Sequence, residues 1–231
     1  MYICSSRLVC FLRNIHRNVR GERRQRLQDV IHAGNALKVA LDFGFDDTMS
    51  EKELRTLSNQ VREVYSSSLR AEDPFHLLFT NYSRTSLLHS LLCRTMNEDP
   101  FCLPIDMREE KVTRLFPRED IVFLTPDAVT ALETLDKTKV YVLGAVADKT
   151  VKKRLTLDAA EGSGIAARRL PIKEYLHQTK PSYTATMTIN QVFDILLMYQ
   201  TTGDWTASLL SAIPPRKGFI ARDEDRQTYN K

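Results

Sequence analysis

The chain has 231 residues, of which 42% are hydrophobic and 27% charged, and its net charge is +4. Its 8 Gly and 9 Pro are too few for long low-complexity stretches, and no apolar run reaches the roughly 18 residues of a membrane-spanning helix. The four Cys form no CxxC spacing and the His are scattered, so the pattern predicts neither a metal site nor a disulfide framework. We expect one globular domain with a basic N-terminal extension.

Positive charge is concentrated at the N-terminal end. Residues 1–40 hold eight Lys and Arg against two acidic residues, so the remaining 191 residues carry a net charge of −2. The first 21 residues contain four Arg, two Ser and no acidic residue, and their apolar residues recur at helical spacing. This composition is typical of a mitochondrial presequence. It equally fits a basic helix that contacts RNA or a partner protein, and both interpretations stay open.

Strands and helices alternate from residue 37 onward. LKVALDF (37–43) predicts a buried strand, and a capping box formed by Ser50 and Glu53 starts a helix after it. DPFHLLFTN (73–81) predicts a second strand and residues 85–95 a second helix. The charged stretch 97–118 contains several Pro and shows no period, so it predicts a long connection.

The alternation continues in the second half. IVFLT (121–125) and KVYVLG (139–144) predict strands, with a helix starting near Asp127 between them. A helix at 156–161, a short strand before Leu170 and a helix at 188–199 follow. Short apolar strands that alternate with helices indicate an α/β fold with a parallel sheet covered on both faces.

Polar residues follow these strands at their carboxyl ends, which is where open α/β sheets bind ligands. Asn81, Asp127 and Asp148 are among them, and we expect them to converge. A cationic run follows Asp148 directly: Lys149, Lys152, Lys153 and Arg154. The sequence contains neither GxGxxG after the first strand nor GxxxxGK[ST], so neither common nucleotide-phosphate loop is predicted.

Five blocks, taken in order, resemble one enzyme family. They are LDFGFDDTMSEKEL, DPFHLLFTN, FLTPDAVTALETLDKTKVYVLGAVADKTVKKRLT, ARRLPIKEYL and MTINQVFDILLMYQTTGDWTASLLSAIPPRKGF. Together they resemble the position-nine tRNA (purine-N1) methyltransferases of the SPOUT, or trefoil-knot, class. DPFHLLFTN is most similar to the animal mitochondrial branch, the methyltransferase subunit of mitochondrial ribonuclease P. The resemblance implies a knotted SPOUT domain at 36–220, after an extension at 1–35 and before a tail at 221–231.

The resemblance also implies S-adenosylmethionine as the cofactor, bound by the loops of the knot. One of these loops runs from Arg169 to Ile172. The expected cofactor-binding residues are Leu124, Thr125, Pro126, Leu143, Gly144, Val146, Asp148, Leu170, Pro171, Met187, Thr188, Ile189, Asn190 and Val192. Gly144 is expected to permit close approach of the backbone to a ligand.

The catalytic carboxylate of the family falls on Asp148, and its asparagine near the target base falls on Asn81. Guanine N1 carries a proton that must leave as the methyl group arrives, so Asp148 is expected to act as a general base. With adenine, Asp148 would orient the base instead. The cations expected to bind tRNA phosphates are Lys149, Lys152, Lys153, Arg154, Arg168, Arg169, Arg216 and Lys217. Trp205 is expected in the core.

The resulting hypothesis is a tRNA methyltransferase of the mitochondrial matrix. By the resemblance its partners are precursor tRNA, a short-chain dehydrogenase scaffold and a pentatricopeptide-type metallonuclease that cuts the 5′ leader. Two alternatives stay open. One is a non-catalytic subunit that presents precursor tRNA to the nuclease, and the other is a nuclear or cytosolic paralogue that methylates guanine alone.

Overall fold

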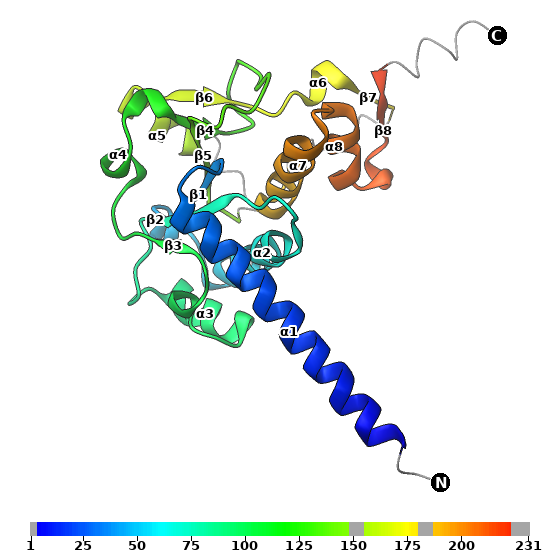
Figure 1. The fold of residues 1–231 in the computed structure, drawn as a ribbon. Helices are drawn as coiled ribbons and strands as arrows, with labels where there is room; N and C mark the ends of the chain where they lie inside the picture. The colour runs from blue at the N-terminus through cyan, green and yellow to red at the C-terminus, as the bar shows by residue number, and fades with distance from the viewer. Residues whose placement is uncertain (1–3, 148–154, 180–186, 223–231) are drawn as a thin grey trace, which may run out of the picture.

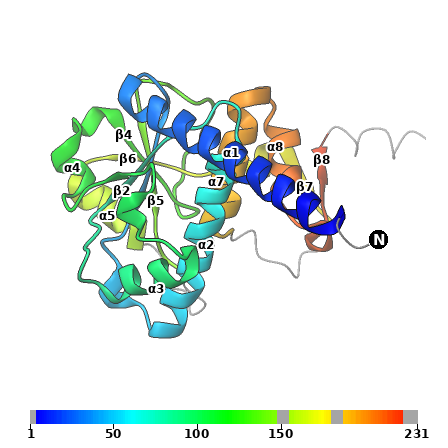
Figure 2. The same ribbon diagram turned by 60° about the horizontal axis from the view of Figure 1, so that its bottom comes forward.

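The computed structural model describes residues 4–147, 155–179 and 187–222, and the side chains from residue 18 onward except that of residue 155. Its first element is the long helix α1 (Cys4–Ala33), which leaves the body of the molecule at its N-terminal end (Figure 1). Figure 2 shows α1 running diagonally across the molecule in front of α2 (Glu51–Arg70). The C-terminal half of α1 packs on the body, where Leu27 is 3% exposed.

A six-stranded parallel sheet forms the centre, in the order β3-β2-β1-β5-β4-β6. This confirms the predicted α/β fold. The strands are β1 (Lys38–Asp42), β2 (His76–Thr80), β3 (Asp106–Met107), β4 (Ile121–Leu124), β5 (Val140–Gly144) and β6 (Ala166–Arg168). In the register of the sheet, Asp42 lies opposite Thr80 on one side and Gly144 on the other. The carboxyl ends of these strands therefore meet at one edge.

Both faces of the sheet are buried, as short continuous apolar strands predict. On one face, strand residues such as Leu41, Phe79 and Leu143 pack with α2, α3 (Leu87–Met96) and α7 (Ile189–Thr202). The other face is covered by α4 (Val112–Leu115) and α5 (Leu155–Ser163), which contribute Val112 and Ala160 to a second apolar cluster. The Ser50–Glu53 capping box at the start of α2 forms as predicted.

The helix predicted to start near Asp127 does not form. Residues 127–138 instead run without helix, and an isolated parallel bridge pairs Ala131 with Arg169. The amide of Leu132 donates to the Arg169 carbonyl at 2.8 Å, and the Arg169 amide donates to the Thr130 carbonyl at 3.0 Å. Tertiary pairing with the segment after β6 supplies backbone partners that the sequence period could not reveal.

Smaller elements complete the chain. The predicted connection 97–118 contains β3, α4 and the 3-10 turn η2 (Pro100–Cys102), and the turns η1 (Asp46–Thr48) and η3 (Arg118–Asp120) flank longer elements. The short helix α6 (Ile172–Tyr175) leads into β7 (Leu176–Gln178), which pairs antiparallel with β8 (Phe219–Ala221). Helix α8 (Trp205–Ala212) and the turn η4 (Pro215–Lys217) lie between α7 and β8.

Trp205 is buried, as predicted. Its ring stacks on Tyr199 with centroids 3.8 Å apart, and its Nε1 donates to the Glu133 carbonyl at 2.7 Å. The knot stays a prediction, because residues 148–154 and 180–186 lie outside the described part of the chain. None of the helices in the described ranges combines the length and apolarity needed to cross a membrane.

Candidate active site

A mainly apolar cavity of about 210 Å³ opens beside the carboxyl ends of β4 and β6. Thr125 and Arg169 directly follow these two strands, and Met187 lies just before α7. The lining residues are Leu124, Thr125, Pro126, Arg169, Leu170, Ile172, Lys173, Met187 and Val192. The volume formed by the described residues is below the roughly 300–1,000 Å³ of pockets for drug-sized ligands, and it accommodates a flat ring system.

Several predicted cofactor residues line this cavity: Leu124, Thr125, Pro126, Leu170, Met187 and Val192. Others do not line it. Leu143 is 3% exposed in the core, and Ile189 is 7% exposed with its amide donating to Gln60 Oε1 at 3.4 Å. Thr188 caps α7 in a box with Gln191, and its hydroxyl donates to Asn190. Pro171 caps α6, and Val146 lies just after β5.

Gly144 makes its close approach to protein rather than to open space. A Cβ at this position would lie 2.5 Å from Thr156 Oγ1 and 3.4 Å from Phe45 Cε2. The glycine therefore lets Thr156 of α5 pack against the end of β5, and the ligand contact expected from the sequence stays a prediction. A larger residue at position 144 would require the Thr156 side chain to shift.

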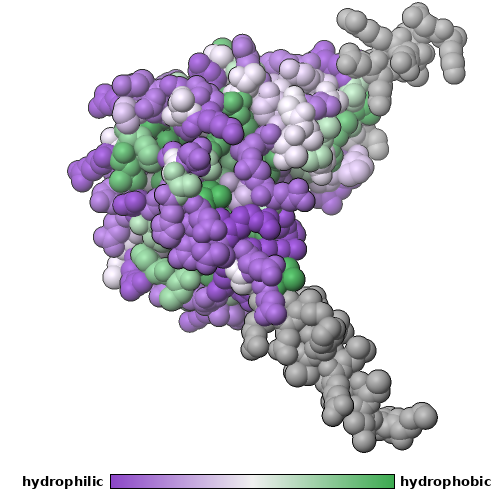
Figure 3. Space-filling model, viewed as in Figure 1, coloured by the Kyte–Doolittle hydropathy of each residue, from purple (hydrophilic) through white to green (hydrophobic). Residues whose placement is uncertain are grey.

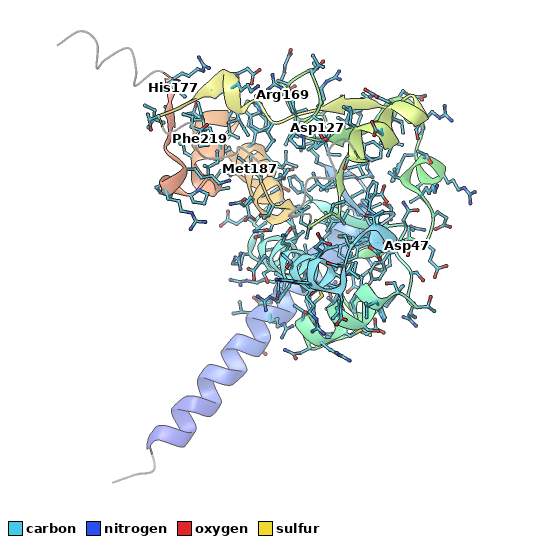
Figure 4. The ribbon with its side chains drawn as sticks, turned by 180° about the vertical axis from the view of Figure 1, so that it is seen from behind. Asp47, Asp127, Arg169, His177, Met187 and Phe219 are labelled. Carbon is cyan, nitrogen blue, oxygen red and sulfur yellow. The ribbon has the colours of Figure 1, made fainter. Side chains whose placement is uncertain are left out.

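Two cations stand at the cavity. Arg169, expected to bind phosphate, forms a bidentate ion pair with Glu174 at 2.6 and 2.9 Å, and this hydrogen bonding raises the pKa of Arg169. Figure 4 shows Arg169, Asp127 and Met187 in the same part of the molecule and Asp47 farther away. Lys173 also lines the cavity. The sequence analysis did not name Lys173 as a site residue, although it belongs to the block ARRLPIKEYL.

A polar cluster lies at the ends of the neighbouring strands β1 and β2. Asn81 has a left-handed backbone with φ 53°, and its side-chain amide donates to Asp42 Oδ1. The Gly44 amide donates to the same oxygen at 3.1 Å. Asp42 is 6% exposed, and burial raises the pKa of its carboxyl while Asn81 and Gly44 lower it. Sequence pattern named Asn81 but could not show this partner.

Asp46 is a second carboxylate beside this cluster. Burial, with the charges of Asp47 and Asp42, raises the pKa of Asp46 to about 7. Its Oδ1 is buried and has no hydrogen-bond partner in the described ranges. Gly44 is held close between the two strands, because a Cβ there would lie 2.9 Å from Asn81 Nδ2.

The central strand β5 lies between β1 and β4, so its end separates the polar cluster from the cavity. The segment after β5 carries the predicted base Asp148 and the cations Lys149, Lys152, Lys153 and Arg154, which all lie outside the described residues. Their roles stay predictions.

The other predicted phosphate ligands are distributed. Arg168 ends β6 and donates to the Ala167 carbonyl at 2.9 Å, and Arg216 and Lys217 lie on η4, where Lys217 accepts through its carbonyl from Gln178. Burial and the charge of Arg216 lower the pKa of Lys217. The sheet edge therefore brings Arg168 and Arg169 together but not the η4 pair.

A second cavity, of about 560 Å³, lies between α1, α2 and the end of α3. Four arginines line it: Arg20, Arg23, Arg62 and Arg70. In Figure 3, hydrophilic residues cover much of the side of the molecule from which α1 departs. Two arginines at this edge of α1 anchor the helix, because Arg24 pairs with Glu98 and Arg26 donates to the Ala71 carbonyl at 2.7 Å.

A family model described as tRNA (guanine(9)-N(1))-methyltransferase TRM10/TRM10A matches residues 12–218. The chain belongs to this family. The tRNA methyltransferase 10 homolog B of Danio rerio is 38% identical over 200 residues, which are 85% of this chain and 64% of that protein. The Homo sapiens homolog B is 35% identical over 210 residues, 90% of this chain and 66% of that protein. The chain thus spans just under two thirds of these TRM10-family relatives.

Solved structures of the TRM10 family share the fold. The crystal structure described as the spTrm10(Full length)-SAH complex is 29% identical, with a TM-score of 0.69 over 77% of this chain and 95% of that chain. A Trm10 from Thermococcus kodakaraensis is 18% identical with a TM-score of 0.58, over 77% of this chain and 99% of that chain. These comparisons confirm the resemblance of the five sequence blocks to the position-nine tRNA methyltransferases, while the similarity to the mitochondrial branch stays a prediction.

Proposed function

We propose that this protein transfers the methyl group of S-adenosylmethionine to N1 of the purine at position nine of tRNA. The observation that carries the proposal is the apolar cavity at the ends of β4 and β6, lined by residues that the family pattern assigns to the cofactor. The family description and the S-adenosylhomocysteine complex of a relative support it.

The residues of the chain fit the cofactor. The apolar walls formed by Leu170, Met187 and Val192 suit an adenine ring, and the buried Thr125 offers a hydroxyl for orientation. S-adenosylmethionine supplies a methyl group already activated on a sulfonium, so positioning the reactants provides much of the rate. The protein would hold the purine N1 in line with that methyl group.

Guanine is the proposed base. Its N1 proton must be accepted as the methyl group arrives, and Asp148 is the proposed acceptor. Asn81, held against Asp42, would present the free face of its amide toward the base. The family description, which prints guanine, supports this preference over adenine.

Methyl transfer to unmodified tRNA carrying G or A at position nine tests the function. Wild-type protein should label the G9 transcript, and Asp148→Asn should lose this activity by roughly 100-fold or more, as loss of a general base does. A transcript with a pyrimidine at position nine is the control. Equal activity of Asp148→Asn and wild type would refute the base role, and tRNA binding without any transfer would favour the presenting subunit.

Cofactor binding can be tested separately from transfer. Val192→Phe should fill the cavity and weaken S-adenosylhomocysteine binding at least tenfold in calorimetry, which corresponds to about 1.4 kcal/mol. Val129→Phe is the matched control, because Val129 is 92% exposed and does not line the cavity. Equal affinities of the two variants would place the cofactor elsewhere.

Arg20 and Arg23 of α1, which line the arginine cavity, are proposed to contact tRNA phosphates. Arg23→Glu and Arg20→Glu should weaken tRNA binding and lower the salt slope by about 0.9 per lost phosphate contact. Arg55→Glu is the control, because Arg55 is an exposed α2 residue paired with Glu51 and does not line the arginine cavity. A salt slope unchanged in all variants would contradict a phosphate role for α1.

We also propose a mitochondrial matrix location, in a ribonuclease P assembly with a short-chain dehydrogenase scaffold and a pentatricopeptide-type metallonuclease. The basic composition of the first 21 residues supports it. The competing proposal is a nuclear or cytosolic guanine-specific enzyme, and the family description, which prints guanine, agrees with its base preference. Import of a reporter fused to residues 1–35 separates the two, since a cytosolic reporter would contradict the matrix proposal.

A further inference from the structure

Three possible metal ligands meet beside α3, apart from the cofactor cavity. His89 and Cys93 are four residues apart on α3 and therefore share a helix face. Cys93 Sγ lies 3.5 Å from His89 Nε2. Asn97 ends the helix with a left-handed φ of 54°, which turns the chain so that Asp99 returns toward this face. One potential ligand atom from each of the three residues lies within 4.8 Å of the others.

The neighbours of this cluster fix its side chains. Tyr82, which is 1% exposed, places its hydroxyl 3.0 Å from His89 Nδ1. The His89 ring meets the rings of Tyr82 and Phe101 at 5.9 and 5.8 Å between centroids. Asp99 Oδ1 accepts from the Phe101 amide at 2.9 Å. A proton on Nδ1 donated to Tyr82 leaves Nε2 as the free lone pair, the arrangement in which histidine binds metals.

We propose that His89, Cys93 and Asp99 bind one zinc ion, with water in the fourth position. Imidazole, thiolate and carboxylate are the ligands of zinc, whose bond lengths of about 2.0–2.3 Å place the ligand atoms of a tetrahedral site roughly 3.3–3.8 Å apart. His89 and Cys93 already meet this spacing. The Asp99 carboxylate would close the remaining gap. Binding releases the Cys93 proton to solvent.

The zinc would brace the turn at the end of β2. Tyr82 directly follows Asn81, and metal on His89 Nε2 keeps the proton on Nδ1 that Tyr82 accepts. The ion would thus stabilise the connection between α3 and the residue that holds Asp42. Binding itself depends only on the three ligands and not on the proposed methyl transfer, so its test does not involve activity.

Metal content and a cobalt spectrum of the full chain test the site. Protein exchanged with zinc should retain one ion per chain by elemental analysis, and cobalt in its place should give a thiolate-to-metal charge-transfer band. Cys93→Ser and His89→Gln should lose the bound ion. Asp99→Asn should bind at least tenfold more weakly, although its amide oxygen can still accept from Phe101. Cys102→Ser, which changes an exposed cysteine near the cluster, should keep both signals.

The melting temperature, measured with and without zinc, distinguishes variants that have lost the metal site from variants that do not fold. Zinc should raise the melting temperature of wild type and Cys102→Ser but not of Cys93→Ser. If Cys93→Ser does not fold, weaker zinc binding by Asp99→Asn than by wild type decides the point in favour of the site. No ion retained by wild type, a cobalt band that persists in Cys93→Ser, or a band lost in Cys102→Ser alone would overturn the proposal.

Discussion

The carboxyl group of Asp42 is buried at the end of β1, where the residue is only 6% exposed. It accepts hydrogen bonds from the Asn81 side chain and the Gly44 amide. The burial raises its pKa, and the two donors oppose this effect. Asn81, which donates to this carboxyl, has a left-handed backbone with φ 53°, a conformation that asparagine tolerates better than most residues. The residue type at position 81 therefore affects both the backbone strain at this strand end and the pKa of Asp42.

Asn81→Ala should destabilise the protein by about 2–4 kcal/mol. It removes a hydrogen bond to a buried carboxylate and replaces asparagine, at a left-handed position, with a residue that tolerates this conformation less well. Urea unfolding at neutral pH measures the loss. Asn81→Gly relieves the backbone but not the carboxylate, so it should be more stable than Asn81→Ala by about 1 kcal/mol. Equal stabilities of the two variants would contradict the backbone contribution.

Asp46 should make the protein less stable as pH rises from about 4 to about 7. Its pKa is raised to about 7 in the folded state, above its ordinary value of 3.8, so the folded state binds the proton more tightly. The stabilisation is complete below the unfolded pKa and is lost as pH rises through the folded pKa. Asp46 is partly solvated, so solvent screening reduces the expected loss to about 1–2 kcal/mol.

The neutral variant Asp46→Asn should lack this pH dependence and should exceed wild type in stability at pH 8, measured by urea unfolding. Asp47→Asn changes the exposed neighbour and should retain most of the wild-type slope. The opposite result would be a free energy of unfolding that rises between pH 4 and 7 by more in wild type than in Asp46→Asn. It would show that the fold lowers the pKa of Asp46 rather than raising it.

Among the elements, local sequence signals predicted those with strong period or caps. The Ser50 box and the spacing of Leu54, Leu57 and Val61 defined α2, and the apolar runs defined β1, β2, β4 and β5. The segment 127–138 was mispredicted because its backbone partners come from residue 169. The two-residue strand β3 and the β7–β8 pair also depend on distant partners, so no local signal marked them.

Trp205 fixes the segment 127–138 against α7 and α8 through Tyr199 and the Glu133 carbonyl. Trp205→Phe should cost about 1 kcal/mol in urea unfolding, because the Glu133 carbonyl loses the indole donor but keeps the longer hydrogen bond from the Tyr199 hydroxyl at 3.3 Å, while a stacked ring remains. Trp205→Ala should cost about 3–5 kcal/mol, since it also leaves a cavity. A Trp205→Phe variant as stable as wild type would show that the indole donor adds nothing to the hydrogen bond from the Tyr199 hydroxyl.

The whole molecule determines which predicted site residues meet. Ligands of open α/β sheets bind beyond the carboxyl ends of the strands, and this rule together with the family pattern pointed to Leu124, Thr125 and Leu170. All three line the cavity beside β4 and β6. The pairing of Asp42 with Asn81 needed the strand register, which the sequence does not display. The meeting of His89, Cys93 and Asp99 needed the turn at Asn97.

The two halves of α1 should contribute differently to the whole molecule. Removing residues 1–17 should change the free energy of unfolding by less than about 1 kcal/mol, whereas Leu27→Ala in the full chain should cost about 2–4 kcal/mol because Leu27 is buried. Leu210→Ala, at a 38% exposed position, is the control and should cost less than about 1 kcal/mol. A large loss on removing residues 1–17 would show that this half also packs on the body.

The length of α1 sets the distance between its N-terminal tip and the sheet edge, which a ligand that contacts both would have to span. A helix of 30 residues measures about 45 Å, and its anchors Arg24 and Arg26 lie near the body while its tip points away (Figure 1). A ligand that touches both the tip and the sheet edge must be tens of ångströms across, so a short oligonucleotide that carried the proposed target base could engage only one of the two.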